Sequence, residues 1–257
     1  MSDRTQTLKL VAAALILFSL ASPASSAEEK KEKKAPPAGT PVLWRAPGDL
    51  PARDLYQGPG GKAMRPDLRR VTFVKEETGG FSKKYRVRDA AGREWVAKLG
   101  KEAQAETAAV RLVWAVGYVT EINYLAPCVR IEGAPDPGKD FERCQGGGFS
   151  NVRFEARPEN VERLDEWKWS ENPFVNTKEL KGLVVMMSLL NNWDIKDTNN
   201  KIIYVPGADG RDGELRYIVS DLGATFGRVK LACRGCGASA ATATTPRTTP
   251  GTPSSKT

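Results

Sequence analysis

Histidine is absent from this chain of 257 residues. Its absence excludes active sites of the Ser-His-Asp and Cys-His types, and it excludes metal sites that need a histidine ligand. Acid–base chemistry near neutral pH must therefore come from carboxylates, lysine, tyrosine or cysteine.

Cysteine is scarce, with four residues in the whole chain. Cys128 and Cys144 flank a loop rich in Gly, Pro and Asp, and the sequence leaves two alternatives open: a disulfide in an oxidising compartment, or two unpaired thiols. Cys233 and Cys236 form a lone CxxC pair. Without a second pair or a histidine, that pair cannot complete a four-ligand zinc site within the chain.

Long apolar runs are also scarce. The stretch Leu10 to Leu20 is too short to span a bilayer comfortably. Arg4 and Lys9 precede it, and a segment of small residues ending at Ala27 follows it. This pattern predicts a cleaved signal peptide over residues 1–27, with an uncleaved anchor as the alternative. We expect an exported protein (periplasm, cell envelope or secreted) whose mature chain has no transmembrane helix.

Acidic residues are outnumbered, 31 against 39 basic ones, which gives a formal net charge of +8. The basic residues are dispersed and form no stripe interleaved with aromatic residues, which argues against nucleic acid as a partner. A basic surface remains compatible with a nucleotide, an acidic lipid or an acidic protein.

Composition divides the chain into four segments. After the signal peptide, residues 28–70 are predicted to be a charged, Pro-rich linker and an irregular extension. Residues 71–230 hold the periodic apolar pattern of a folded domain. Residues 231–257 consist mostly of Ala, Thr, Pro, Ser and Gly, and are predicted to be a disordered tail.

The first half of the folded domain predicts strands around one helix. Apolar residues recur at helical spacing over Lys101 to Val116. The predicted strands are a three-stranded meander followed by two further strands: Val71 to Val74, Tyr85 to Asp89, Glu94 to Gly100, part of Tyr118 to Ile131, and Val152 to Ala156.

The second half predicts a helix followed by a hairpin. Asn176 and Glu179 have the spacing of a capping box at the start of a helix over Asn176 to Asn191. This helix is apolar on nearly every face, so we expect it to be buried. The hairpin pairs Lys201 to Val205 with Leu215 to Val219.

Two motifs flank that hairpin: "NNWDIKDTNN" over Asn191 to Asn200 and "IVSDLGATFG" over Ile218 to Gly227. Together with "WVAK" ending at Lys98, they resemble the atypical, HipA-like and secretory-kinase-like branch of the protein-kinase-like fold. The first motif has Asn-Trp-Asp where most protein kinases have His-Arg-Asp, and the second has Asp-Leu-Gly for Asp-Phe-Gly. The resemblance covers roughly Val71 to Gly227.

The resemblance implies an α+β, two-lobe fold, with an antiparallel N-terminal sheet plus one helix and a helical C-terminal lobe. Few large apolar residues follow Gly227. We therefore expect the C-terminal lobe to be truncated, leaving exposed apolar surface on the helix over Asn176 to Asn191.

The resemblance also assigns roles to the acidic motifs. Asp194 would orient or deprotonate the attacking hydroxyl, and Asn199 and Asp221 would hold Mg²⁺. Asp197 and Asn200 are the nearest competitors for these roles. A second interpretation is that the Asx residues of the first motif only build a turn after a helix.

In the first half, Lys98 corresponds to the strand lysine that contacts the nucleotide phosphates. Its helix partner would be Glu106, with Glu102 as the alternative one helical turn earlier. Gly79 and Gly80 would bring backbone N–H groups near phosphate, and Val96 would contact the adenine ring. A plain hairpin turn explains the two glycines nearly as well.

These assignments predict a phosphotransferase that uses ATP and Mg²⁺. A nucleotide would be one partner, and the acceptor hydroxyl would lie on a protein, with a lipid or small molecule as alternatives. Two other functions stay open: a catalytically inactive kinase-like module that binds a partner or nucleotide, and an exported scaffold protein.

Overall fold

The structure, a computed structural model, describes residues 37–80, 82–208 and 212–227. The predicted signal peptide, the start of the predicted linker and the predicted tail with Cys233 and Cys236 lie outside these ranges. All elements described below belong to one compact unit that begins at Ala38.

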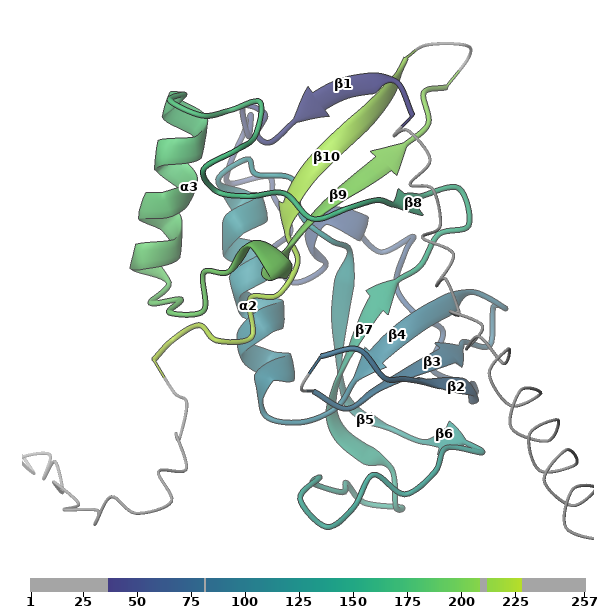
Figure 1. The fold of residues 1–257 in the computed structure, drawn as a ribbon. Helices are drawn as coiled ribbons and strands as arrows, with labels where there is room; N and C mark the ends of the chain where they lie inside the picture. Colours follow the sequence, from purple (N-terminus) through teal and green to yellow (C-terminus); the bar gives the residue numbers. More distant parts are fainter. Residues whose placement is uncertain (1–36, 81, 209–211, 228–257) are drawn as a thin grey trace, which may run out of the picture. The chain divides into compact units, whose positions relative to one another are not determined.

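The first sheet has six strands in the order β5-β7-β4-β3-β2-β6 (Figure 1). Its centre is the predicted meander, antiparallel throughout, and β6 pairs in parallel with β2. The strands are β2 (Val71–Glu77), β3 (Lys84–Arg88), β4 (Glu94–Lys98), β5 (Asn123–Val129), β6 (Ile131–Glu132) and β7 (Phe149–Ala156). The predicted strands of the first half are therefore confirmed.

Period-two alternation in β4 decides what each face of this sheet covers. Trp95 and Ala97 are buried in an aromatic core with residues of β3, β5 and β7. Val96 and Lys98 point to the other face, where Lys98 meets α2 (Glu102–Ala115). The predicted helix over 101–116 is confirmed, and it follows β4 directly.

The second sheet has four strands in the order β1-β10-β9-β8. The predicted hairpin forms β9 (Asn200–Val205) and β10 (Gly213–Val219), and β8 (Glu162–Arg163) extends it. The strand β1 (Gly39–Val42) pairs in parallel with β10, although the composition of residues 28–70 predicted a linker and irregular structure there. Two short 3-10 turns complete the elements: η1 (Gly58–Gly60) and η2 (Asp197–Asn199).

The predicted cap of the second helix is wrong by one residue. α3 spans Lys178–Leu189, and Thr177 is its N-cap, because Thr177 Oγ1 accepts the Leu180 N–H at 3.2 Å. Asn176 has a φ of 71°, which turns the chain just before the cap.

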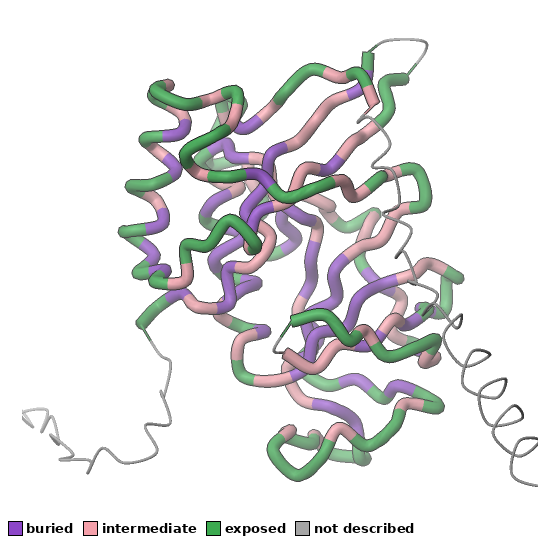
Figure 2. Tube along the Cα trace, in the orientation of Figure 1, coloured by how far each residue is buried: buried purple, intermediate pink, exposed green. Residues whose placement is uncertain are grey.

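α3 is also less buried than its apolar sequence predicted. Leu180, Leu183 and Met187 pack into a core shared with α2 and Trp167. On the outward side, Val185 and Leu189 are 58% and 76% exposed (Figure 2). The expectation of exposed apolar surface on this helix is met within the described residues.

The architecture is mixed α+β, as predicted. In the described ranges it consists of two sheets with two α-helices, α2 and α3. A kinase-like division into two lobes remains a prediction. No described helix has the length and apolar character needed to cross a bilayer.

Candidate functional site

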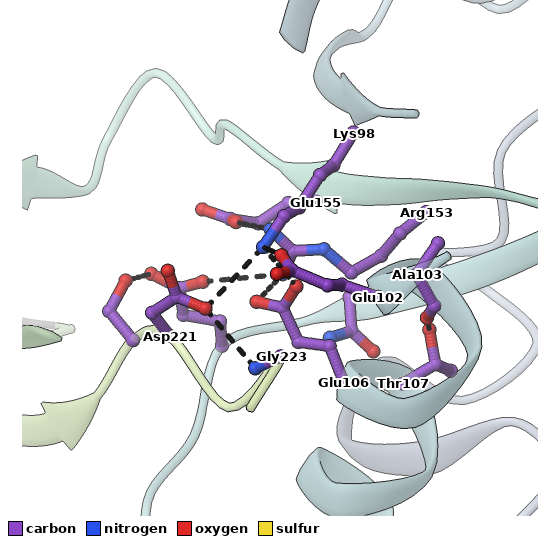
Figure 3. Close-up of polar contacts among 12 residues, drawn as sticks. Lys98, Glu102, Ala103, Glu106, Thr107, Arg153, Glu155, Asp221 and Gly223 are labelled. Carbon is purple, nitrogen blue, oxygen red and sulfur yellow. Dashed lines mark hydrogen bonds and ion pairs between the residues drawn. The ribbon is translucent and has the colours of Figure 1, made fainter. Parts of the chain in front are cut away.

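Lys98 is the centre of the candidate site. Its side chain is 2% exposed, and its Nζ contacts three carboxylates. Glu106 Oε2 lies at 2.9 Å, Glu102 Oε2 at 3.0 Å and Asp221 Oδ1 at 3.4 Å (Figure 3). Burial alone would lower the pKa of Lys98, but the negative charges of Glu106 and Asp221 outweigh it and hold the pKa above its ordinary value. The lysine is therefore a fixed positive charge.

Both helix glutamates predicted as alternatives contact Lys98, and they differ in burial. Glu106 is fully buried, whereas the Glu102 side chain is 42% exposed. Burial raises the pKa of Glu106, against the attraction of Arg153 and Lys98. Arg153 Nη1 lies 3.0 Å from Glu106 Oε1, so the buried carboxylate sits between two cations.

Asp221 follows β10 and extends toward Lys98 from the second sheet. Its Oδ1 also accepts the Gly223 N–H at 3.1 Å. Burial would raise the pKa of Asp221, but Lys98 and the Gly223 N–H lower it below its ordinary value, so the group is ionised. Gly223 allows this approach, because a Cβ there would lie 3.0 Å from Glu102 Oε2 and 3.2 Å from Asp221 Oδ1.

The backbone of Asn199 is hydrogen-bonded to the segment that carries Asp221. Its carbonyl accepts the Ser220 N–H at 2.7 Å and the Asp221 N–H at 3.3 Å. Its side-chain Nδ2 donates to the Asp194 carbonyl at 2.7 Å and to Asp194 Oδ2 at 3.2 Å. Asn199 therefore connects the predicted base, Asp194, with the other predicted metal ligand, Asp221.

Asp194 is also paired with a lysine. Lys196 Nζ lies 2.8 Å from Asp194 Oδ1, and the hydrogen bond and charge of Asp194 raise the pKa of Lys196. The two competitors named from the sequence have other partners. Asp197 Oδ1 accepts the Trp169 N–H at 3.1 Å, and Asn200 Nδ2 donates to the Trp167 carbonyl at 3.0 Å.

The donor set fits a hard cation. Asn199 Oδ1 and Asp221 Oδ2 make no hydrogen bond with other described residues, and both are the oxygen type that Mg²⁺ prefers. No group of three or more His, Cys, Asp or Glu side chains is placed to hold a metal within the described ranges. Mg²⁺ commonly takes one or two protein ligands and completes its shell with phosphate and water.

The predicted phosphate-loop and adenine residues are less closely gathered. Gly79 and Gly80 are exposed in the β2–β3 turn, where the Gly79 carbonyl accepts from Lys84 Nζ at 3.0 Å. The turn reaches the site indirectly, because Ser82 Oγ donates to Glu102 Oε2 at 2.8 Å. Val96 shares the face of Lys98 but is buried, with 3% exposure.

A cavity of about 370 Å³ opens between the two sheets, and its lining does not include Lys98 or Asp221. It is lined by residues of β3, β4, β8, the segments before β5 and after β7, and the β9–β10 hairpin. Its arginines are all paired with carboxylates. These arginines are Arg86, Arg157, Arg163 and Arg216.

Sequence reasoning missed the buried ionic network behind the site. Glu155 Oε2 lies 2.7 Å from Arg153 Nη2, and Glu121 Oε1 lies 2.7 Å from Arg163 Nη2. Ser220 Oγ, next to Asp221, donates to Glu121 at 2.8 Å. The signal was present in "VRFEA", where opposite charges alternate with apolar residues. Such alternation is equally typical of a strand with one wet face.

Comparisons of this chain with protein-family models, with curated proteins and with solved structures found no match.

Proposed function

We propose that this protein is a phosphotransferase that moves the γ-phosphoryl group of ATP, with Mg²⁺, to a hydroxyl group. The observation that carries the proposal is the position of Lys98, a buried cation held between Glu106 of α2 and Asp221 beyond β10. Phosphoryl transfer depends on positioned charge more than on covalent help from the protein. Lys98 and Asp221 supply such charges, and Asn199 supplies a neutral side-chain oxygen for the metal.

Lys98 would bind the nucleotide phosphates, and Glu106 would fix its direction. A lysine ammonium has three donors, and here each already faces a carboxylate. Glu102 is the exposed member of the three, so phosphate would most readily replace Glu102. Mg²⁺ held by Asn199 and Asp221 would neutralise charge on the transferring group.

In the proposed step, the acceptor oxygen forms a bond to the γ-phosphorus while the bond from that phosphorus to the bridging oxygen of ADP breaks. The hydroxyl proton passes to the Asp194 carboxylate, and ADP leaves with the bonding electron pair. Asn199 holds Asp194 in place through its side-chain amide. Lys196 would have to release Asp194 Oδ1 for this role.

A second candidate function is a catalytically inactive kinase-like module. The observation that favours it is the occupancy of the site by its own side chains: Lys98 has three carboxylate partners, and Asp194 is paired with Lys196. Such a protein would bind a nucleotide or a partner without transferring phosphate.

We propose an exported location for the protein. Cys128 and Cys144 form a disulfide in the structure, across 16 positions of sequence. Structural disulfides persist in oxidising compartments such as the periplasm and the extracellular space. ATP is scarce there, so the acceptor and nucleotide would have to meet the enzyme before or during export, or in a compartment that supplies ATP.

The test of the proposed function is single-turnover transfer of radiolabelled γ-phosphate, either to the protein itself or to a panel of hydroxyl acceptors. Asp194→Ala should abolish transfer while ATP affinity stays nearly unchanged, because Asp194 would act on the acceptor hydroxyl and not on the nucleotide phosphates. Asp197→Ala is the matched control in the same turn and should retain transfer. Transfer by Asp194→Ala within a few-fold of the unmodified protein removes Asp194 from the mechanism.

A further inference from the structure

A second cavity, of about 230 Å³, lies against α2 and is separate from the candidate site. We call it the α2 cavity. Its walls come from α2, from β5 and from the segment around η1. Its lining residues are Leu55, Tyr56, Gln57, Arg65, Gln104, Thr107, Ala108, Arg111, Tyr124 and Leu125.

Arg111 is the buried charged residue in its wall, and its charge is not neutralised by an ion pair. The side chain is 6% exposed, and within the described residues no carboxylate lies in ion-pair range of it. Its Nη1 and Nη2 donate to the side chain and backbone oxygens of Asn123 at 3.1 and 2.5 Å. Buried charges are normally paired, and leaving one unpaired is costly.

Asp54 acts on Arg111 electrostatically but forms no ion pair with it. Asp54 is exposed, and its Oδ1 accepts the backbone N–H groups of Tyr56 and Gln57, both at 3.0 Å. Burial lowers the pKa of Arg111, and the charges of Tyr124 and Asp54 offset that effect only in part. The Nε–H of Arg111 donates to no other described residue.

Gln57 has an unpartnered side-chain atom in this wall. It is 5% exposed, and its Oε1 is buried without a hydrogen-bond partner. That oxygen is an acceptor, so an anion in the cavity cannot pair with it, and only the Gln57 Nε2 amide group can donate to one. This group donates to no other described residue.

The backbone at η1 lies close to Arg111 and Tyr124. Gly58 has a φ of 68°, and a Cβ there would lie 2.3 Å from Arg111 Nη1. Gly60 allows a similar approach to Tyr124, because a Cβ there would lie 2.3 Å from the Tyr124 hydroxyl. These glycines let η1 lie directly on the arginine and the tyrosine.

The lining as a whole has positive charge and apolar surface. It contains Arg65 and Arg111 but no Asp or Glu. Leu55, Tyr56 and Leu125 supply apolar and aromatic contacts, and the Arg65 guanidinium lies over the Tyr56 ring at 5.8 Å. The volume is below the usual range of ligand pockets, roughly 300–1,000 Å³, which favours a small ligand.

We propose that the α2 cavity binds a small organic carboxylate carried on an aromatic or apolar group, with its carboxylate on Arg111 and Gln57. One carboxylate oxygen would accept from the Arg111 Nε–H, and the other would accept from the Gln57 Nε2 amide group. The ring or chain of the ligand then lies against the tyrosine and leucine side chains. This inference stands independently of the proposed phosphotransferase function.

The first test is a titration of the full chain with benzoate, followed by NMR of the arginine Nε–H groups. Saturable binding that shifts the Arg111 Nε–H signal is expected. Neutral benzamide has the same shape and should bind at least about tenfold more weakly, because it loses the charge-assisted hydrogen bond. Equal affinity for the two compounds, no saturation, or tighter binding of inorganic phosphate overturns the proposal.

The second test uses exposed arginines, since changing buried Arg111 could prevent folding. Arg65→Gln at the edge of the cavity should weaken benzoate binding by about three- to tenfold. Arg70→Gln is the control, because Arg70 is exposed and pairs with Glu132 outside the cavity. An equal loss of affinity in both variants, or no loss in either, contradicts the assignment of the ligand to the α2 cavity.

Discussion

The Nζ of Lys98 lies 3.4 Å from Asp221 Oδ1, although 123 positions of sequence separate the two residues. Lys98 ends β4 of the six-stranded sheet, and Asp221 follows β10 of the four-stranded sheet. Their contact therefore connects the two sheets at one point. Glu106 of α2 binds the same Lys98 ammonium, so this contact also holds α2 against the two sheets.

Removing the buried carboxylate should cost far more stability than removing the exposed one. Glu106→Gln leaves Lys98 and Arg153 without their shared negative charge in a buried site, and we expect a loss of about 3–5 kcal/mol in the free energy of unfolding. Glu102→Gln is the matched control on the same helix, and should cost about 1 kcal/mol or less because Glu102 is partly exposed. Urea unfolding measures both values. Equal losses would contradict the pairing described for Glu106.

Stability should fall as pH rises toward and through neutrality, because of Glu121. Burial and the negative charge of Glu155 raise the pKa of Glu121 from 4.5 to about 7. Between these two values the folded protein binds more protons than the unfolded chain, so the free energy of unfolding declines with rising pH. Burial would raise the pKa of Glu155 too, but Arg157 and Arg153 hold it well below its ordinary value, outside this window.

Glu121→Gln should remove most of that decline while keeping an acceptor for Ser220 Oγ. The difference between the two proteins from pH 5 to pH 8 should be at most about 3 kcal/mol, since one pKa unit corresponds to about 1.4 kcal/mol. Glu132→Gln, at an exposed ion pair, is the control and should leave the pH slope unchanged. Parallel pH profiles for Glu121→Gln and the unmodified protein would show that Glu121 is ionised throughout.

Loss of the disulfide should destabilise the protein measurably. Cys128 and Cys144 close a loop across 16 positions, and chain-entropy arguments give about 3 kcal/mol for a loop of that length. Unfolding of the double variant Cys128→Ser, Cys144→Ser, compared with the unmodified protein with and without a reductant, tests this. If the reductant leaves the unmodified protein's stability unchanged, the two cysteines are unpaired in solution.

The strands and α2 could be predicted because their residues alternate or recur with one clear period. In β4, "EWVAK" places Trp95 and Ala97 in the core and Val96 and Lys98 on the opposite face, and the structure has this arrangement. The grouping of Asp194 with Asn199, and of Lys98 with Glu106, followed from the resemblance of the motifs.

Other features depend on contacts that a local pattern does not contain. β1 is a short segment of a Pro-rich stretch, and it becomes a strand only because β10 offers a parallel edge. The capping box at Asn176 competed with Thr177, and Thr177 forms the cap because Asn176 takes a left-handed conformation. η1 lies against Arg111 and Tyr124 only because Gly58 and Gly60 have no Cβ there.

The most direct test of the central proposal is ATP binding by calorimetry, with and without Mg²⁺, for the unmodified chain and for Asp221→Asn. We expect Mg²⁺ to strengthen ATP binding, and Asp221→Asn to weaken Mg²⁺-dependent binding by at least about tenfold, because the amide loses the charge attraction to the metal. Asp212→Asn, in the exposed loop before β10, should bind like the unmodified chain. ATP affinity that is independent of Mg²⁺, or equal in the Asp221→Asn and unmodified proteins, would contradict the assignment of this site.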